Sequence, residues 1–257
     1  MDISKRFQNE NLADHWQVDD SKSSFECLLF HLEHRTNFKV YFLEALQKLN
    51  MEQSTPPIVI ADIGAGIGWT SALMARHPKV HKVYGVDASD KRLQHAKFVS
   101  NHFNIQSKIE IIKGTFEHFN VNQAVDFVVL CGSLHHCYNK QMKTLFLNIK
   151  KILKPHGKVL IANEHYVNYV WTLKRFLSYL KGLLKRKEVF NGTLTSLRAP
   201  DPFDGEHWRT RKELEHIFHQ NGFRYQFFIH KGDLCLDKYS WYHRLGWFYY
   251  YAVLESK

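Results

Sequence analysis

Apolar runs of strand length alternate with segments of helical periodicity along the middle of the chain. The runs predict strands at 58–63, 82–87, 108–114, 126–132 and 158–164, and the periodic segments predict helices at 69–77, 89–103 and 140–153. Apolar strands separated by helices are typical of a parallel sheet that helices cover on both faces. We therefore expect a doubly wound α/β fold.

Both ends of the chain depart from this alternation. The segment 23–50 has helical spacing, with apolar positions at Phe25, Leu28, Leu29, Leu32, Phe38, Phe42, Leu46 and Leu49. After a helix at 209–221, strands are expected at 223–230 and 247–255 with no clear helix between them, which favours an antiparallel pair at the sheet edge. The expected units are an N-terminal helical cap (1–54), a core (55–164), an inserted lid (165–208) and a C-terminal completion of the core sheet (209–257).

The composition fits one globular unit with these elaborations. The chain has 257 residues, of which 44% are hydrophobic and 23% charged, so it can bury a full core. No uncharged apolar run reaches the roughly 20 residues of a membrane-spanning helix, and the N-terminus lacks the apolar region of a signal peptide. The four cysteines, Cys27, Cys131, Cys137 and Cys235, are too scattered for a disulfide framework. We expect a cytoplasmic protein.

The loop after the first strand, ADIGAGIGWT (61–70), carries the first chemical signal. Gly64, Gly66 and Gly68 would expose backbone amides at a helix N-terminus, an arrangement that usually binds phosphate. The third glycine comes one position too early for the dinucleotide fingerprint, and no P-loop Lys-Ser/Thr pair follows. Asp62 lies just before the glycines and would repel a pyrophosphate. The loop therefore predicts a ligand without phosphate.

Asp87 ends the second predicted strand, which is the usual place for a carboxylate that accepts hydrogen bonds from ribose hydroxyls. This placement favours a cofactor that contains adenosine. The alternative is that Asp87 only caps the following helix, a role that Ser89 could equally fill. Other residues at strand ends are Gly114-Thr115-Phe116, Cys131-Gly132-Ser133 and Asn163-Glu164-His165.

Five segments occur in order at workable spacings: IADIGAGIGWT, VYGVDASDKRLQHAK, IKGTFEHF, FVVLCGSLHHC and IKKILKPHGKVLIANE. Together they resemble the class I S-adenosylmethionine-dependent methyltransferases, over roughly residues 55–165 and again in the C-terminal strands. The resemblance implies a Rossmann-like, seven-stranded sheet with its last strand antiparallel, and S-adenosylmethionine as the cofactor.

The resemblance also implies a set of cofactor-binding residues. Asp62 and the three glycines would hold the methionine moiety, Asp87 the ribose, and the residues after the third strand the adenine. Where Thr115 stands the family often has an acidic residue, so the adenine amino contact is expected from a backbone carbonyl or from Glu117. The full predicted set is Asp62, Gly64, Gly66, Gly68, Asp87, Ala88, Thr115, Phe116, Cys131 and Ser133.

Two adjacent histidines, His135 and His136, follow the fourth strand, where active sites of this family commonly face the substrate. A hydroxyl acceptor is helped by a general base, and we expect His136 to fill that role. The alternative is that both histidines only bond the backbone. Glu164 and His207 are the other candidate catalytic residues, because each belongs to an acid-histidine pair that could line the substrate pocket.

A metal site is not expected at the segment that holds Cys131, His135, His136 and Cys137. The spacing of these residues matches no recognised zinc pattern. Adjacent histidines are also expected to point apart.

The positive charge is concentrated in the insertion. The formal net charge of the chain is +10, and from His165 to Lys212 there are ten Lys or Arg against four Asp or Glu. One apolar helical face is expected in this segment, formed by Tyr166, Leu173, Phe176, Leu177, Leu180, Leu183 and Leu184. Thr210 is expected to cap the following helix.

This basic helix has three interpretations: a structural cap, a lid that attracts an anionic acceptor such as a phosphorylated or lipid-linked sugar, or a helix on an anionic membrane. The predicted function is methyl transfer to an oxygen or nitrogen of a small, or lipid- or glycan-linked, acceptor. The alternatives are an RNA methyltransferase, since basic charge favours nucleic acid, and a non-catalytic protein that binds S-adenosylmethionine or a partner.

Overall fold

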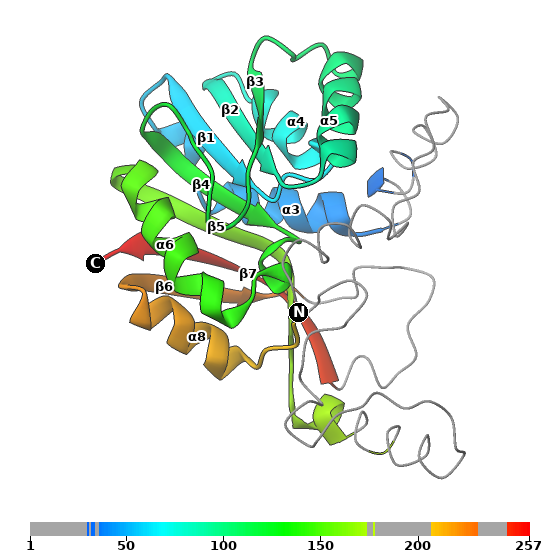
Figure 1. The fold of residues 1–257 in the computed structure, drawn as a ribbon, viewed down its shortest axis with the longest axis vertical. Helices are drawn as coiled ribbons and strands as arrows, with labels where there is room; N and C mark the ends of the chain where they lie inside the picture. Colours follow the sequence, from blue (N-terminus) through cyan, green and yellow to red (C-terminus); the bar gives the residue numbers. More distant parts are fainter. Residues whose placement is uncertain (1–29, 31, 34–35, 174–176, 178–206, 231–245) are drawn as a thin grey trace.

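A computed structural model describes residues 30, 32–33, 36–173, 177, 207–230 and 246–257. Seven strands form one sheet in the order β3-β2-β1-β4-β5-β7-β6 (Figure 1). β7 runs antiparallel to both of its neighbours, and the other adjacent strands are parallel, so the predicted Rossmann-like sheet is confirmed. The strands are β1 (Ile58–Ile63), β2 (Val80–Asp87), β3 (Ile109–Lys113), β4 (Val125–Cys131), β5 (Leu153–Val167), β6 (Phe223–Ile229) and β7 (Trp247–Ser256).

Helices cover both faces of the sheet, as expected for a doubly wound fold (Figure 1). One face is covered by α3 (Phe38–Gln47), α4 (Trp69–Ala75) and α5 (Asp90–His102), and the other by α6 (Asn139–Ile152) and α8 (Arg211–Gln220). Side chains alternate between the faces of a strand, so a strand between two helical layers must be apolar at successive positions. All six residues of β1 are buried for this reason.

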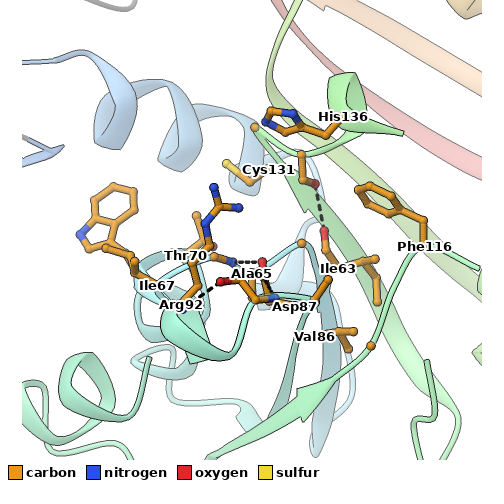
Figure 2. Close-up of a pocket in the computed structure, with 18 of the residues that line it drawn as sticks. Ile63, Ala65, Ile67, Thr70, Val86, Asp87, Arg92, Phe116, Cys131 and His136 are labelled. Atoms are coloured by element: carbon orange, nitrogen blue, oxygen red, sulfur yellow. Dashed lines mark hydrogen bonds between the residues drawn. The ribbon is translucent and has the colours of Figure 1, made fainter. Parts of the chain in front are cut away.

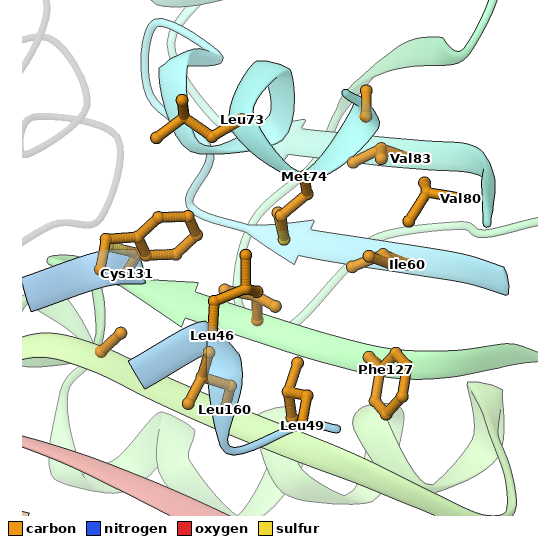
Figure 3. Packing of buried hydrophobic residues seen from close by; sticks show 14 of the residues in the cluster. Leu46, Leu49, Ile60, Leu73, Met74, Val80, Val83, Phe127, Cys131 and Leu160 are labelled. Carbon is orange, nitrogen blue, oxygen red and sulfur yellow. The ribbon is translucent and has the colours of Figure 1, made fainter. Parts of the chain in front are cut away.

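The N-terminal helical extension packs on the first of these layers. Phe42, Leu46 and Leu49 are buried in one cluster with Met74 of α4 and the strands beneath, and Figure 3 shows Leu46 and Leu49 beside that helix and the sheet. The apolar spacing predicted from Phe38 to Leu49 is therefore confirmed. The earlier positions Phe25, Leu28 and Leu29 lie outside the described residues.

β5 is longer than its own apolar pattern predicts. It begins directly after α6 at Leu153 and continues to Val167, three residues beyond the expected end. Residues His165, Tyr166 and Val167 pair with β7, whose antiparallel backbone supplies hydrogen bonds beyond the end of β4. The expectation that Tyr166 belongs to a helical face of the insertion is therefore wrong.

The segment predicted to form an inserted lid (165–208) is described only in part. Residues 165–173, 177 and 207–208 are described, and the remainder, with most of the predicted basic helix, lies outside the described residues. After the insertion, Thr210 caps α8 as predicted: its hydroxyl accepts from the Glu213 amide, and the Glu213 carboxylate accepts from the Thr210 amide at 2.7 Å. In the part of the chain that the structure describes, no helix is both long and apolar enough to span a membrane.

Candidate cofactor-binding and active site

The glycine loop lies at the carboxyl end of β1, where the chain order reverses between β1 and β4. Ligands of open α/β sheets bind at such a switch point. Gly64, Gly66 and Gly68 have φ angles of 75°, 57° and 75°, which residues with side chains rarely adopt. A Cβ at Gly64 would lie 2.5 Å from the Cβ of Ser133, and one at Gly68 would lie 2.8 Å from that of Ala96, whereas one at Gly66 meets nothing within 4 Å. Gly64 and Gly68 thus permit close packing, and Gly66 leaves open space at the loop.

Asp87 joins this loop to the end of β2. Its Oδ2 accepts from the Gly66 amide at 2.8 Å, and its Oδ1 accepts from the Ser89 amide at 2.9 Å. The helix cap is Ser89, whose hydroxyl accepts from the Arg92 amide at 3.3 Å. Because each carboxylate oxygen has two lone pairs, Asp87 is positioned by these amides and keeps acceptor capacity for a diol.

Asp62 is fully buried beside the loop. Its Oδ2 accepts from the hydroxyls of Thr70 at 2.8 Å and Ser71 at 2.6 Å, while its Oδ1 is buried without a hydrogen-bond partner. Burial raises the pKa of Asp62 to about 6, and the two hydroxyls oppose that shift. Thr70 lines the pocket, whereas Asp62 itself does not, so Asp62 fits an indirect contact with a ligand.

One pocket connects the loop with the ends of β2, β3 and β4. Figure 2 shows Asp87 beside Ala65 of the loop, and Phe116 and His136 on the segments that follow β3 and β4. The predicted cofactor residues that line this pocket are Gly64, Gly66, Asp87, Ala88, Thr115, Phe116, Cys131 and Ser133. Gly68 and Asp62 lie outside the lining, the former against α5 and the latter beneath α4.

The turn after β3 forms the side of the pocket expected to hold adenine. The backbones of Thr115 and His118 bond each other, and the Thr115 hydroxyl accepts from the His118 amide at 3.1 Å. Glu117 accepts from the Gln141 side chain at 2.8 Å and does not line the pocket. Of the two alternatives for the adenine contact, the backbone carbonyl therefore fits this placement better.

The segment after β4 brings His136 to the same pocket. The Ser133 hydroxyl donates to the carbonyl of Ile63 at 2.9 Å, and the chain then forms the short 3-10 helix η4 (Leu134–His136). His136 lines the pocket, while the Nδ1 of His135 lies 2.9 Å from the Glu164 carboxylate. The centroids of the two histidine rings are 4.1 Å apart, so the expectation that the rings point apart is wrong. The contact with Glu164 fixes the His135 ring beside that of His136.

The other two candidate catalytic residues contact this segment and do not line the pocket. Glu164 is 1% exposed, and it accepts from the amides of Leu134 at 2.6 Å and His135 at 3.2 Å. The His207 amide donates to the carbonyl of His135 at 2.9 Å. His136 is thus the one of the three that the structure places at the pocket. Among the described residues, no three His, Cys, Asp or Glu side chains gather as a metal site.

Sequence reasoning missed two contributors. Phe38, at the start of α3, lines the pocket and lies edge-on to Trp69, and its carbonyl accepts from the Asn163 side chain at 3.0 Å. Its helical spacing indicated only core packing. Arg209 is 5% exposed and donates from Nε to Asn139 at 3.0 Å and from Nη1 to the Leu134 carbonyl at 3.4 Å. No signal in the sequence distinguished Arg209 from the other basic residues of its segment.

The fold and this pocket define a doubly wound α/β domain with a pocket at its switch point. Residues 60–157 match the family described as "Methyltransferase domain". The chain therefore carries a class I S-adenosylmethionine-dependent methyltransferase domain.

A curated relative, the histone-arginine methyltransferase CARMER of Drosophila mojavensis, is 35% identical over 101 residues, which are 39% of this chain and 18% of the relative. This chain thus spans less than a fifth of that relative's length. A solved geranyl diphosphate methyltransferase in complex with SAM is 13% identical, with a TM-score of 0.61 and 93% of each chain covered. A methyltransferase from Clostridium acetobutylicum is 11% identical, with a TM-score of 0.59, 92% of this chain and 99% of that chain covered. At these identities the likeness to the solved structures shows the fold alone.

The cofactor of this domain is S-adenosylmethionine, and the residues present fit it. Gly66 has no side chain and leaves room for the cofactor to approach the loop backbone closely. Asp87 is oriented by two amides as an acceptor for ribose hydroxyls. The orphaned Oδ1 of Asp62 provides negative charge near the loop, which suits an ammonium group and not a phosphate.

Proposed function

We propose that this chain is an enzyme that transfers a methyl group from S-adenosylmethionine to an oxygen or nitrogen of a small acceptor, including anionic, lipid-linked or glycan-linked ones. The carrying observation is that His136 lines the same pocket as the glycine loop and Asp87. S-adenosylmethionine supplies an electrophilic methyl group on a sulfonium. The protein's task is then to align a nucleophile and to accept its proton.

His136 is the residue proposed to accept that proton. A neutral imidazole is a competent base near neutral pH, and His136 lies at the end of the pocket formed by the segment after β4. Phe116 lines the pocket as an apolar wall, which favours exclusion of water from a bound acceptor. In this proposal Asp87 and the glycine loop bind and orient the cofactor, and His136 holds the proton taken from the acceptor.

The pocket suits a neutral nucleophile better than a guanidinium, although the curated relatives are named histone-arginine methyltransferases. A desolvated guanidinium substrate is stabilised most strongly by a carboxylate that pairs with it through two hydrogen bonds. Among the described lining residues the one carboxylate is Asp87, and its remaining acceptor capacity is assigned here to the ribose hydroxyls of the cofactor. Glu164 is bonded to Leu134 and His135. A hydroxyl or amine acceptor is therefore proposed.

The basic composition of the insertion supports an anionic acceptor or contact with an anionic membrane surface. RNA is the alternative that the same charge supports. Replacing Lys181, Lys185 and Arg186 together by Gln should weaken an anionic acceptor, and the loss should shrink at high salt because salt screens exposed charge. Activity that ignores both salt and this substitution would leave the insertion without an electrostatic role.

The direct test is incubation of the protein with methyl-labelled S-adenosylmethionine and fractionated cell extract. We expect label in a small-molecule, lipid or glycan fraction, and we expect Asp87→Ala to abolish it. Label in RNA would support the alternative enzyme. Cofactor binding without label in any fraction would support a non-catalytic protein. The variant His81→Ala is the matched control, because His81 is exposed on β2 and away from the pocket lining.

A further inference from the structure

The segment Leu134–Cys137, hereafter the histidine loop, has few backbone bonds of its own. As a 3-10 turn it contributes the bonds from His136 to the Ser133 carbonyl at 3.0 Å and from Cys137 to the Leu134 carbonyl at 3.0 Å. Such turns have poorer hydrogen-bond geometry than an α-helix. The loop is therefore also held from other segments, by the bond from the His207 amide to the His135 carbonyl at 2.9 Å and by side chains that reach it.

Glu164 holds the amide side of the histidine loop. Its two oxygens accept from the amides of Leu134 and His135, and its Oε2 also lies 2.9 Å from the His135 ring nitrogen. Hydrogen bonds to a charged acceptor are stronger than those between neutral groups. One carboxylate in the last part of β5 thus fixes two successive residues immediately before His136.

Arg209 holds the carbonyl side of the same loop. Its Nη1 donates to the Leu134 carbonyl at 3.4 Å, its Nη2 donates to the Cys137 carbonyl, and its Nε donates to Asn139 at 3.0 Å. The backbone carbonyl of Arg209 accepts from the Val167 amide at 2.9 Å, so Arg209 is itself tied to the end of β5. The planar guanidinium reaches the first and last residues of the loop at once.

The two groups carry opposite charges and both are buried, at 1% exposure for Glu164 and 5% for Arg209. Burial lowers the pKa of Arg209, and nearby negative groups, Glu164 among them, oppose that shift. Packing of apolar side chains would hold a loop at lower desolvation cost than two buried ions. Directional bonds to four backbone groups instead fix where the loop lies.

We infer that Arg209 is a positioning residue for His136, acting together with Glu164 on opposite sides of the histidine loop. The inference rests on the proposed function, because the exact position of the loop matters for the rate only if His136 is the base. A shift of about 1 Å in a reacting group can cost about 100-fold in rate. Loosening the loop should therefore slow turnover far more than it weakens the cofactor.

The variants are Arg209→Lys and Glu164→Gln. Arg209→Lys keeps the positive charge but loses the planar guanidinium that reaches several acceptors, and Glu164→Gln keeps the shape of the side chain but loses its charge. Arg211→Ala is the matched control, because Arg211 is two residues away and forms an exposed ion pair with Glu215 on α8. Three measurements apply to each: affinity for S-adenosylhomocysteine by calorimetry, hydrogen exchange at the loop amides, and label transfer to the extract fraction that the wild type labels best.

We expect Arg209→Lys and Glu164→Gln to lower kcat by about 10- to 100-fold, with S-adenosylhomocysteine affinity within about twofold of wild type. Loop amides should exchange faster in both variants, and the control should match the wild type. Wild-type kcat with unchanged exchange would overturn the inference. So would a loss of affinity and thermal stability in step with kcat, since that would mark a purely structural role.

Failure of the proposed function is separable from failure of this inference. If the wild type labels no fraction, the proposed function fails, while loop exchange and the NMR titration of His136 remain measurable. Faster exchange with a displaced His136 titration in Arg209→Lys would still support the positioning role. An unchanged loop and titration would overturn it.

Discussion

The amide of Gly66 donates to the carboxylate of Asp87 at 2.8 Å, a bond that joins the carboxyl ends of β1 and β2. The Ser89 amide holds the second oxygen of the same carboxylate. Asp87 is therefore oriented before any ligand arrives, and binding does not have to order it. A preorganised acceptor of this kind loses less affinity to side-chain ordering.

Replacing Asp87 by Ala should weaken S-adenosylmethionine binding by about 100-fold or more, because hydrogen bonds to a charged acceptor contribute about 1.5–3 kcal/mol each. Calorimetry measures this loss directly. Asp90→Ala is the matched control, since Asp90 is an exposed carboxylate that pairs with Lys113 and does not line the pocket. Wild-type affinity in Asp87→Ala would contradict the assignment of the ribose site.

Gly64→Ala and Gly66→Ala should have different consequences. The Cβ at Gly64 would collide with Ser133 at 2.5 Å and the positive φ adds strain, so this variant should lose about 2–5 kcal/mol of unfolding free energy. Gly66→Ala meets no neighbour, and its positive φ should cost about 1–2 kcal/mol, but its methyl group enters the open space at the loop. Urea unfolding measures the loss of stability, which should be larger in Gly64→Ala. Calorimetry with S-adenosylmethionine measures whether the methyl group of Gly66→Ala hinders cofactor binding. Equal stability of Gly64→Ala and wild type would show that the loop can relax.

Local patterns predicted most of the fold because each strand between two helical layers is apolar along its length. β1 and β4 were recognisable for this reason, and Asp87 followed from its place at the end of β2. The length of β5 was not predictable in this way. Its last three residues are strand residues because β7 pairs with them, and their partners in β7 lie 80 to 84 positions later in the chain.

The histidine loop likewise depends on residues distant in the chain, which local sequence patterns do not predict. Its sequence identified His136 as a candidate, and the pocket contains it. The groups that hold the loop come from Glu164 and Arg209, on segments about 30 and 70 residues away. The sequence indicates Glu164 only as a candidate catalytic residue that could line the substrate pocket. A glutamate that bonds backbone amides and a glutamate that faces a substrate look the same in a sequence. Only the folded structure separates the two roles.

Replacing His136 by Ala should lower kcat by about 10²- to 10⁴-fold, the usual contribution of a positioned general base. Cofactor affinity should stay close to that of the wild type, because the predicted ribose and methionine contacts come from Asp87 and the glycine loop. The comparison uses label transfer and calorimetry side by side, with His81→Ala as the control. Unimpaired transfer by His136→Ala would remove this residue from the mechanism.

Asp62 should make the stability of the unliganded protein depend on pH in an unusual direction. Burial raises its pKa from 3.8 to about 6, so between these values the folded chain holds a proton that the unfolded chain has released. The free energy of unfolding from this group is therefore highest below pH 3.8 and falls as pH rises to 6. A shift of this size corresponds to about 3 kcal/mol, at about 1.4 kcal/mol for each pH unit.

Asp62→Asn cannot titrate, so its unfolding free energy should rise relative to that of the wild type by up to about 3 kcal/mol between pH 4 and pH 7. Urea unfolding at several pH values gives this difference, in which the other titrating groups cancel. Asp90→Asn, which changes an exposed carboxylate, should run parallel to the wild type. Addition of S-adenosylmethionine should reduce the difference at pH 7, because a cationic ligand near Asp62 favours its charged form. Parallel curves for Asp62→Asn and wild type would show that the buried carboxylate is already compensated in the unliganded protein.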